Sequence, residues 1–140
     1  MYSPTAIEPR ITTKEILVRQ YHLDSYHHVN NMRYLEFLEE ARWAHFENCD
    51  AIRMARQGGL GILIASYDLN YKYQAQLGQV LRIETSVAEI NRCTIIFLQQ
   101  IFLKGTDQKV LDGKIKVVTV NTRTQRPSAI PDDIRYELFR

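Results

Sequence analysis

The residue types best suited to chemistry in this 140-residue chain gather between positions 22 and 42. Asp24 stands in a polar segment, and a largely apolar stretch with helical spacing begins shortly afterwards, near Asn30 or Asn31. Asparagine is a favoured helix cap, and a helix start offers unpaired backbone N–H groups with a partial positive charge. A carboxylate beside such a start can attack a carbonyl carbon, or activate water, while the amides stabilise the oxyanion. The segment therefore predicts acyl transfer or hydrolysis.

The same segment resembles a known family. Its pattern, Asp-x-x-x-His-Val-Asn-Asn-x-x-Tyr-Leu followed by Glu-Glu-x-Arg, resembles the opening motif of hot-dog-fold acyl-CoA thioesterases of the 4-hydroxybenzoyl-CoA thioesterase-like superfamily. Residues 21–43 are most similar to the bacterial long-chain acyl-CoA thioesterase branch, and a looser likeness continues to about Pro131. The resemblance implies hydrolysis of acyl-CoA, a homodimer or homotetramer with sites at subunit interfaces, and no metal or other cofactor.

The resemblance also implies roles for individual residues. Asp24 matches the family's nucleophile or general base, and the amide of Asn31, seven residues later, matches the group that polarises the thioester carbonyl. His28 orients the loop or acts as an acid or base, and Asn30 and Tyr34 are assigned to substrate binding. A plainer alternative stays open, because aspartate and asparagine are also common loop and helix-cap residues.

One position departs from the family pattern. Many superfamily members have glycine directly before the motif histidine, whereas this chain has His27, and glycine reaches backbone conformations that other residues adopt less easily. The spacing of His22, His27 and His28 fits no familiar metal-ligand signature, so polar loop histidines are favoured over a metal site.

Charged residues further along the predicted helix provide a fallback. Another branch of the fold carries its catalytic glutamate on the central helix. Glu40 falls on the polar stripe, while Glu39 and Arg42 lie at the edges of the apolar face with i,i+3 spacing. A structural ion pair, to the sheet or to a second subunit, is the favoured interpretation, and the two glutamates become candidates if Asp24 is dispensable.

Hydrophobic periodicity predicts the elements that hold this segment. Residues 14–20 form a first strand, and a helix that is apolar around most of its circumference runs to about residue 48. Strands follow at 63–73, 80–90, 92–103 and 110–120, the first with its odd-numbered apolar side chains facing the core, and 132–139 form a short helix. Short connections favour an antiparallel sheet, which gives an α+β fold with residues 1–140 as a single domain. The hot-dog arrangement, a curled sheet around one long central helix, is implied by the resemblance.

Composition excludes several function classes. The chain is 45% hydrophobic and 24% charged with a formal net charge of +2, which is usual for a soluble domain and lacks the basic excess of nucleic-acid-binding proteins. Its longest apolar runs, such as residues 60–65, are too short to cross a bilayer, so neither nucleic acid nor membrane is expected as a partner. The opening residues 1–4 lack a secretory pattern, and Cys49 and Cys93 lack paired spacing. We therefore expect a cytoplasmic protein with reduced thiols.

Several alternatives remain open. A hot-dog hydratase or dehydratase would act on the acyl chain, but typically carries a different motif. A non-catalytic module would bind acyl-CoA unchanged, and the acyl carrier could be a protein instead of CoA. Lys72, Arg82 and Arg92 could meet CoA phosphates, but nothing distinguishes them from ordinary solvated charges.

Overall fold

The structure is a computed structural model that describes residues 10–47 and 49–139. These residues form a five-stranded antiparallel sheet with the strand order β1-β3-β4-β5-β2. The strands are β1 (Thr12–Leu17), β2 (Leu60–Tyr71), β3 (Val80–Ile90), β4 (Thr94–Leu103) and β5 (Lys109–Asn121). Pro4 and Pro9 predict an irregular lead-in over residues 1–10, of which residues 1–9 lie outside the described residues.

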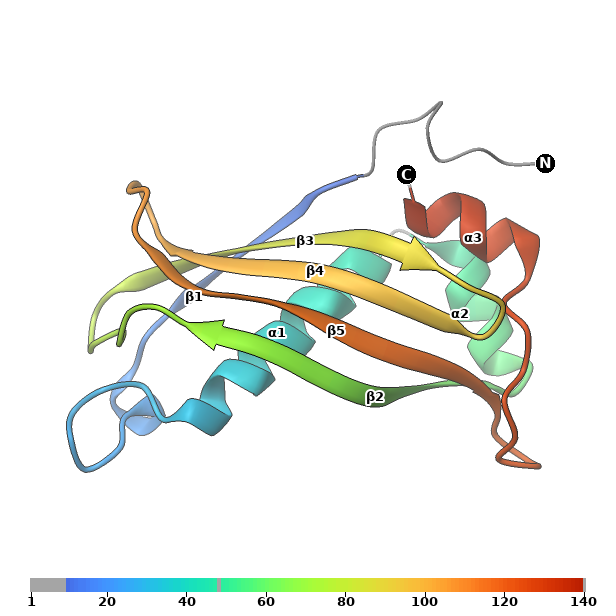
Figure 1. Ribbon diagram of the computed structural model, residues 1–140, viewed down its shortest axis with the longest axis horizontal. Helices are drawn as coiled ribbons and strands as arrows, with labels where there is room; N and C mark the ends of the chain where they lie inside the picture. Colours follow the sequence, from blue (N-terminus) through green and yellow to red (C-terminus); the bar gives the residue numbers. More distant parts are fainter. Residues whose placement is uncertain (1–9, 48, 140) are drawn as a thin grey trace.

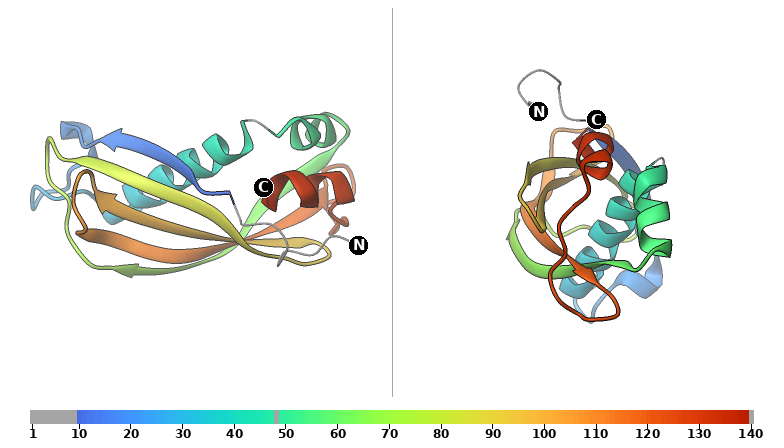
Figure 2. Two further views of the ribbon diagram at one scale, coloured as in Figure 1. Left: turned by 90° about the horizontal axis from the view of Figure 1, so that it is seen from above. Right: turned by 90° about the vertical axis from the view of Figure 1, so that its right-hand side faces the viewer.

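A long helix, α1 (Asn31–Phe46), crosses one face of this sheet (Figure 1), and the strands curve around it in the end view (Figure 2). Helices α2 (Asp50–Gln57) and α3 (Asp132–Phe139) lie near the end of the sheet where α1 finishes. The expected α+β arrangement, a curled antiparallel sheet around one long central helix, is confirmed. Within the described residues, no helix is both long enough and apolar enough to cross a membrane.

Helix α2 was not among the predicted elements. The apolar residues Ala51, Ile52, Met54 and Ala55 recur at helical spacing, so this eight-residue helix carries an amphipathic signal that the predicted elements left out. Gly58 and Gly59 end the helix and lead directly into β2.

The central strands follow the predicted alternation. The strand predicted at residues 80–90 is observed with those bounds, and β3, β4 and β5 turn alternate side chains toward the core except near shifts in pairing, such as that beside Val110 and Leu111 of β5. A side chain on one face of a strand recurs every two residues, so these strands supply most of the core. Their fully buried apolar side chains are Leu81, Ile83, Phe97, Ile101, Val110, Leu111 and Ile115.

The predicted inward face of β2 is wrong at its beginning. The pairing of β2 with β5 shifts between Ile64 and Ser66, where the strand carries an extra residue. A bulge of this kind changes which residues face the core. Tyr67 and Leu69 therefore pack inward as predicted, whereas Leu63, expected to be inward, is 54% exposed.

A network of buried hydrogen bonds lies beside α1 where an ion pair was expected. Arg42 is buried, and its guanidinium donates to the Gln99 side-chain oxygen at 3.1 Å and to the Tyr67 hydroxyl at 3.1 Å. Gln99 in turn donates to the Leu38 carbonyl and the Thr85 hydroxyl. In the part of the chain that the structure describes, no carboxylate pairs with Arg42, so hydrogen bonds and not the predicted ion pair join Arg42 to the sheet; an ion pair to a second subunit stays a prediction.

A buried histidine, His45, fixes the C-terminal end of α1. His45 Nε2 lies 3.2 Å from the Leu138 carbonyl of α3, and Nδ1 lies 2.8 Å from the Thr12 hydroxyl of β1. A carbonyl can only accept, so Nε2 carries the proton and Nδ1 accepts from the hydroxyl. Burial, reinforced by the nearby Arg10 guanidinium, lowers the pKa of His45 to about 4. The ring is therefore neutral and joins three elements at the end of the helix.

Candidate active site

The segment before α1 is a short loop closed on itself. A 3-10 turn, η2 (Gln20–His22), precedes it, Leu23 pairs with Val29, and the Asp24 amide donates to the His28 carbonyl at 2.9 Å. The loop is also attached to the chain that follows β2, because the Val29 amide donates to the Ala75 carbonyl at 2.9 Å. Backbone hydrogen bonds thus close the loop over residues 23–29 and hold it against the segment that follows β2.

Two further backbone amides orient the Asp24 carboxylate. Its Oδ1 accepts from the Tyr26 amide at 2.8 Å and from the His28 amide at 3.3 Å. Both bonds use the same oxygen, and Oδ2 has no hydrogen-bond partner among residues 10–47 and 49–139. The carboxylate is therefore oriented by the backbone while one oxygen stays available to a water molecule or an acyl group.

His27 has a backbone conformation that favours glycine. Its φ is 63°, in the left-handed region where residues with a side chain are uncommon. The loop therefore has the bend that a glycine would permit, and the strain of about 1–2 kcal/mol falls on His27.

The start of α1 presents an open amide beside this carboxylate. Asn30 is the N-cap, and its side-chain oxygen accepts from the Met32 amide at 2.8 Å, while its carbonyl accepts from the Arg33 amide at 2.9 Å. Asn31 is the first helical residue, and its own amide has no acceptor within the described chain. An unpaired N–H at a helix start is suited to bind an oxyanion.

A cavity of about 540 Å³ brings most of the predicted site residues together. Asp24, His28, Asn31 and Tyr34 line it, whereas Asn30 does not and serves as the helix cap. The remaining lining residues were not predicted as site residues; they are Val29, Tyr71, Lys72, Tyr73, Gln74 and Gln76. Most of them come from the end of β2 and the segment after it, which no local motif links to the loop.

Tyr34 forms the inner wall of this cavity. It is 2% exposed, its ring stacks at a tilt against Tyr71 at 5.6 Å, and its hydroxyl accepts from the Ala75 amide at 3.1 Å. Burial raises the pKa of Tyr34, so the hydroxyl stays protonated at neutral pH. The observed contacts make Tyr34 part of the support between α1 and the segment after β2.

The histidines and basic residues considered from the sequence separate in space. His22 is buried against Phe37, and its Nδ1 accepts from the Arg19 amide at 2.9 Å, whereas His27 is exposed. The described residues contain no cluster of three or more potential metal ligands. Of the three basic candidates for CoA binding, Lys72 lines the cavity, Arg82 pairs with Glu84 at 3.4 Å, and Arg92 is exposed.

Taken together, the cavity offers an oriented carboxylate, an unpaired amide at a helix start, an apolar inner wall and one lysine at its rim. This combination suits addition of water, or of the carboxylate itself, to an acyl carbonyl whose developing negative charge meets the Asn31 amide.

Comparison with known proteins agrees with this chemistry. A family model for the thioesterase-like superfamily matches residues 18–138. The chain is 38% identical over 124 residues to the long-chain acyl-CoA thioesterase FadM of Escherichia coli K12, covering 89% of this chain and 94% of that protein. It is 28% identical to the chloroplastic acyl-acyl carrier protein thioesterase ATL2 of Arabidopsis thaliana, covering 86% of this chain and 64% of that protein.

Solved structures extend the comparison to three dimensions. The crystal structure of the probable thioesterase YbaW from Escherichia coli superposes with a TM-score of 0.84 at 35% identity, covering 92% of this chain and 99% of that one. The region matched by the family model includes the loop at Asp24, the long helix and strands β2 to β5, and it begins directly after β1. The chain is therefore a hot-dog-fold member of the thioesterase-like superfamily.

Proposed function

We propose that this protein hydrolyses long-chain acyl-CoA thioesters to free fatty acids and CoA. The observation that carries the proposal is the shared cavity into which the carboxylate of Asp24 and the unpaired amide of Asn31 both open. The relationship to FadM, whose name specifies long-chain acyl-CoA, supports this choice of substrate. The cytoplasmic location and the absence of a nucleic-acid or membrane partner, expected from the sequence, stay predictions.

In the proposed reaction, the free oxygen of Asp24 removes a proton from water as the water oxygen forms a bond to the thioester carbon. The carbonyl oxygen becomes an oxyanion that accepts a hydrogen bond from the Asn31 amide. The C–S bond then breaks, and the departing CoA thiolate takes up the proton. Direct attack by the carboxylate, followed by hydrolysis of the anhydride, uses the same two groups and gives the same products.

The residues around these groups have supporting roles in the proposal. The His28 amide donates to Asp24, and this matches the orienting role for His28 better than a chemical one. Asn30 acts by capping the helix that presents the Asn31 amide, and Tyr34 supports the cavity wall. Lys72 is placed to meet a phosphate of CoA at the rim.

We also propose that the protein works as a homodimer joined through β2. This twelve-residue strand is an edge of the sheet, paired on one side with β5, and it carries Leu63 and Ile64 at 54% and 45% exposure. A long edge strand with exposed apolar residues is a ready pairing site for a second chain. Ile64→Lys should therefore give a monomer by light scattering, where the unsubstituted protein gives a dimer or a tetramer built from such dimers.

The direct test of the proposed function is release of free thiol from acyl-CoAs of graded chain length. The unsubstituted protein should release thiol, most rapidly from long-chain substrates, and Asp24→Asn should not. Thiol release from acyl carrier protein substrates alone would favour the ATL2-like alternative, which rests on the 28% identity. Binding of acyl-CoA without release, unchanged in Asp24→Asn, would instead identify a non-catalytic binding module.

A further inference from the structure

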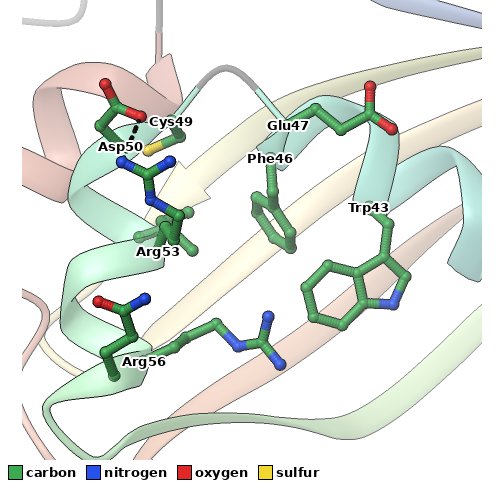
Figure 3. Close-up of a pocket in the computed structure, with 9 residues that line it drawn as sticks. Trp43, Phe46, Glu47, Cys49, Asp50, Arg53 and Arg56 are labelled. Atoms are coloured by element: carbon green, nitrogen blue, oxygen red, sulfur yellow. Dashed lines mark ion pairs between the residues drawn. The ribbon is translucent and has the colours of Figure 1, made fainter.

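Buried titratable side chains lie at both ends of α1. At its last turns, Cys49 lines a groove of about 510 Å³ between α1 and helix α2 (Figure 3). Burial, together with a hydrogen bond to the Glu137 side chain, raises the pKa of Cys49 to about 11, so the thiol stays protonated. His22 lies at the other end, in the turn that precedes the Asp24 loop, and it is 8% exposed. Of these two groups, His22 is the one that adjoins the chemistry.

The backbone of His22 closes the base of the Asp24 loop. Its carbonyl accepts from the Asn30 amide at 2.9 Å, and its amide donates to the Arg19 carbonyl at 2.9 Å. Asn30 is the N-cap of α1, and the loop over residues 23–29 lies between these two bonded residues. The position of His22 therefore sets how the Asp24 carboxylate lies relative to the first turn of α1.

One hydrogen bond and two aromatic contacts hold the ring of His22. Nδ1 accepts from the Arg19 amide at 2.9 Å, so the neutral ring carries its proton on Nε2. The centre of the ring lies 4.9 Å from that of Phe37 and 4.4 Å from that of Tyr21, both in edge-to-face geometry. The contact with Phe37 attaches the turn to α1, and the bond to Nδ1 fixes the orientation of the ring in that contact.

Protonation of Nδ1 is incompatible with this arrangement, because a protonated Nδ1 is a donor and cannot accept from the Arg19 amide. Burial lowers the pKa of His22, an effect that Arg33 reinforces and Glu36 opposes. The ring lines a cavity of about 370 Å³ between β1 and α1, whose other charged lining residues are Lys14, Glu15, Arg19, Glu36 and Glu40. Acidic and basic groups are mixed there, so burial decides the charge, and the ring is neutral at neutral pH and accessible to protons in acid.

We propose that His22 is a positioning residue for thioester hydrolysis and that it acts only while its Nδ1 is unprotonated. The inference rests on the proposed function, because the groups that His22 positions are the Asp24 carboxylate and the Asn31 amide. With Nδ1 unprotonated, the turn, the loop and the start of α1 keep one arrangement. Once Nδ1 is protonated, the ring leaves the Arg19 amide and the His22 carbonyl no longer holds Asn30 in place.

Two substitutions at His22 separate the acceptor from the ring. His22→Asn keeps an acceptor for the Arg19 amide, because Oδ1 branches from Cγ as Nδ1 does, whereas His22→Phe keeps a ring against Phe37 and has no acceptor. Near neutral pH, kcat for thiol release should fall about tenfold in His22→Phe and at most about threefold in His22→Asn, with KM within about twofold in both. Equal losses, or a larger loss in His22→Asn, would overturn the proposal.

The pH dependence is a readout that packing alone would not change. Both His22→Asn and the wild type keep Asp24, so protonation of that carboxylate cancels in the ratio of their kcat values. This ratio should rise several-fold as the pH falls from about 7 to about 5, because the wild type alone has a ring to protonate at this position. A constant ratio would contradict the proposal.

His27→Asn is the matched control for these pH profiles. It removes an exposed histidine from the same loop, and asparagine tolerates the left-handed backbone at φ 63°. Its kcat relative to the wild type should stay constant across this pH range. A rise equal to that of His22→Asn would assign the effect to histidine loss in general and overturn the role of His22.

NMR tests the arrangement independently of catalysis. The wild-type His22 ring should be the Nε2–H tautomer, and the Asn30 amide should exchange its hydrogen faster in His22→Phe than in His22→Asn or the wild type. The Nδ1–H tautomer, or equal exchange in all three proteins, would overturn the positioning role. A wild-type protein that releases no thiol from any substrate would refute the proposed function, whereas the tautomer and the exchange rates depend on the fold, so the two failures are distinguishable.

Discussion

The two ends of helix α1 differ in whether their polar groups find partners within the protein. At its start, next to the exposed cap Asn30, Asn31 with its unpaired amide and Asp24 with one free carboxylate oxygen line an open cavity. At its end, the neutral ring of His45 is fully buried and satisfies both nitrogens within the protein. The comparison indicates that the helix is anchored at one end, so that unsatisfied groups at the other end can be held in place for chemistry.

The strongest test of this comparison removes the carboxylate from the open end. Asp24→Asn keeps the shape of the side chain and can still accept from the Tyr26 and His28 amides, but it cannot act as a base or nucleophile. We expect kcat for thiol release to fall about a hundredfold or more. The denaturation midpoint should barely change, and turnover near that of the wild type would move attention to Glu39 and Glu40.

A proline at Asn31 tests the amide separately from the side chain. Proline is well tolerated at the first helical position, and Asn30 already has the extended backbone that a following proline requires. Asn31→Pro should therefore fold normally but lose about a hundredfold in kcat, because the donor to the oxyanion is gone. Asn31→Ala keeps the amide and should lose only a few-fold; a large loss in this control would assign the role to the side chain.

Acid should destabilise the protein through His45, which anchors the end of α1. The pKa of His45 is about 4 in the folded protein and about 6.5 when unfolded, so the unfolded state binds the extra proton first. Stability should therefore decline as the pH falls from about 6.5 to 4, by up to about 3 kcal/mol. Urea denaturation across this range measures the decline. His45→Gln should be less stable at pH 7 and should show a shallower slope, whereas an unchanged slope would show that other groups cause it.

The smallest effect is expected at His27, which is strained but chemically unassigned. His27→Gly relieves the left-handed strain while adding freedom to the unfolded chain, so the two effects should offset each other to within about 1 kcal/mol. His27→Val cannot easily adopt φ 63° and should cost about 1–2 kcal/mol, together with several-fold in turnover as the Asp24 loop shifts. Thermal melts and kcat for both variants decide the point, and equal behaviour of glycine and valine would contradict it.

Local sequence patterns predicted the elements whose structure depends on residues that are neighbours in the chain. The helix start at Asn30 and Asn31 and the strand at residues 80–90 were recognisable because caps and two-residue alternation leave direct traces in the sequence. The grouping of Asp24, His28, Asn31 and Tyr34 also followed from one continuous motif, and the structure brings these four to one cavity.

What could not be predicted depends on distant partners. The bulge near Ala65 is a feature of the pairing between β2 and β5. Arg42 donates hydrogen bonds to Gln99 and Tyr67 on strands of the sheet, not to a neighbour on its own helix. The helix α2 carries one buried residue, and the groove beside it arises only when that helix meets the end of α1. The bulge, the contacts of Arg42 and the groove have no short-range signature, whereas α2 itself has apolar residues at helical spacing.

The attachment of the Asp24 loop to the chain leaving β2 has a kinetic consequence. Ala75 accepts from the Val29 amide and donates to the Tyr34 hydroxyl, so the loop and the end of the edge strand are linked through one residue. If pairing with a second copy restricts the motion of β2, this link also restricts the motion of the Asp24 loop. Specific activity should then rise with enzyme concentration and level off as association becomes complete, which makes the rate per subunit a reporter of assembly.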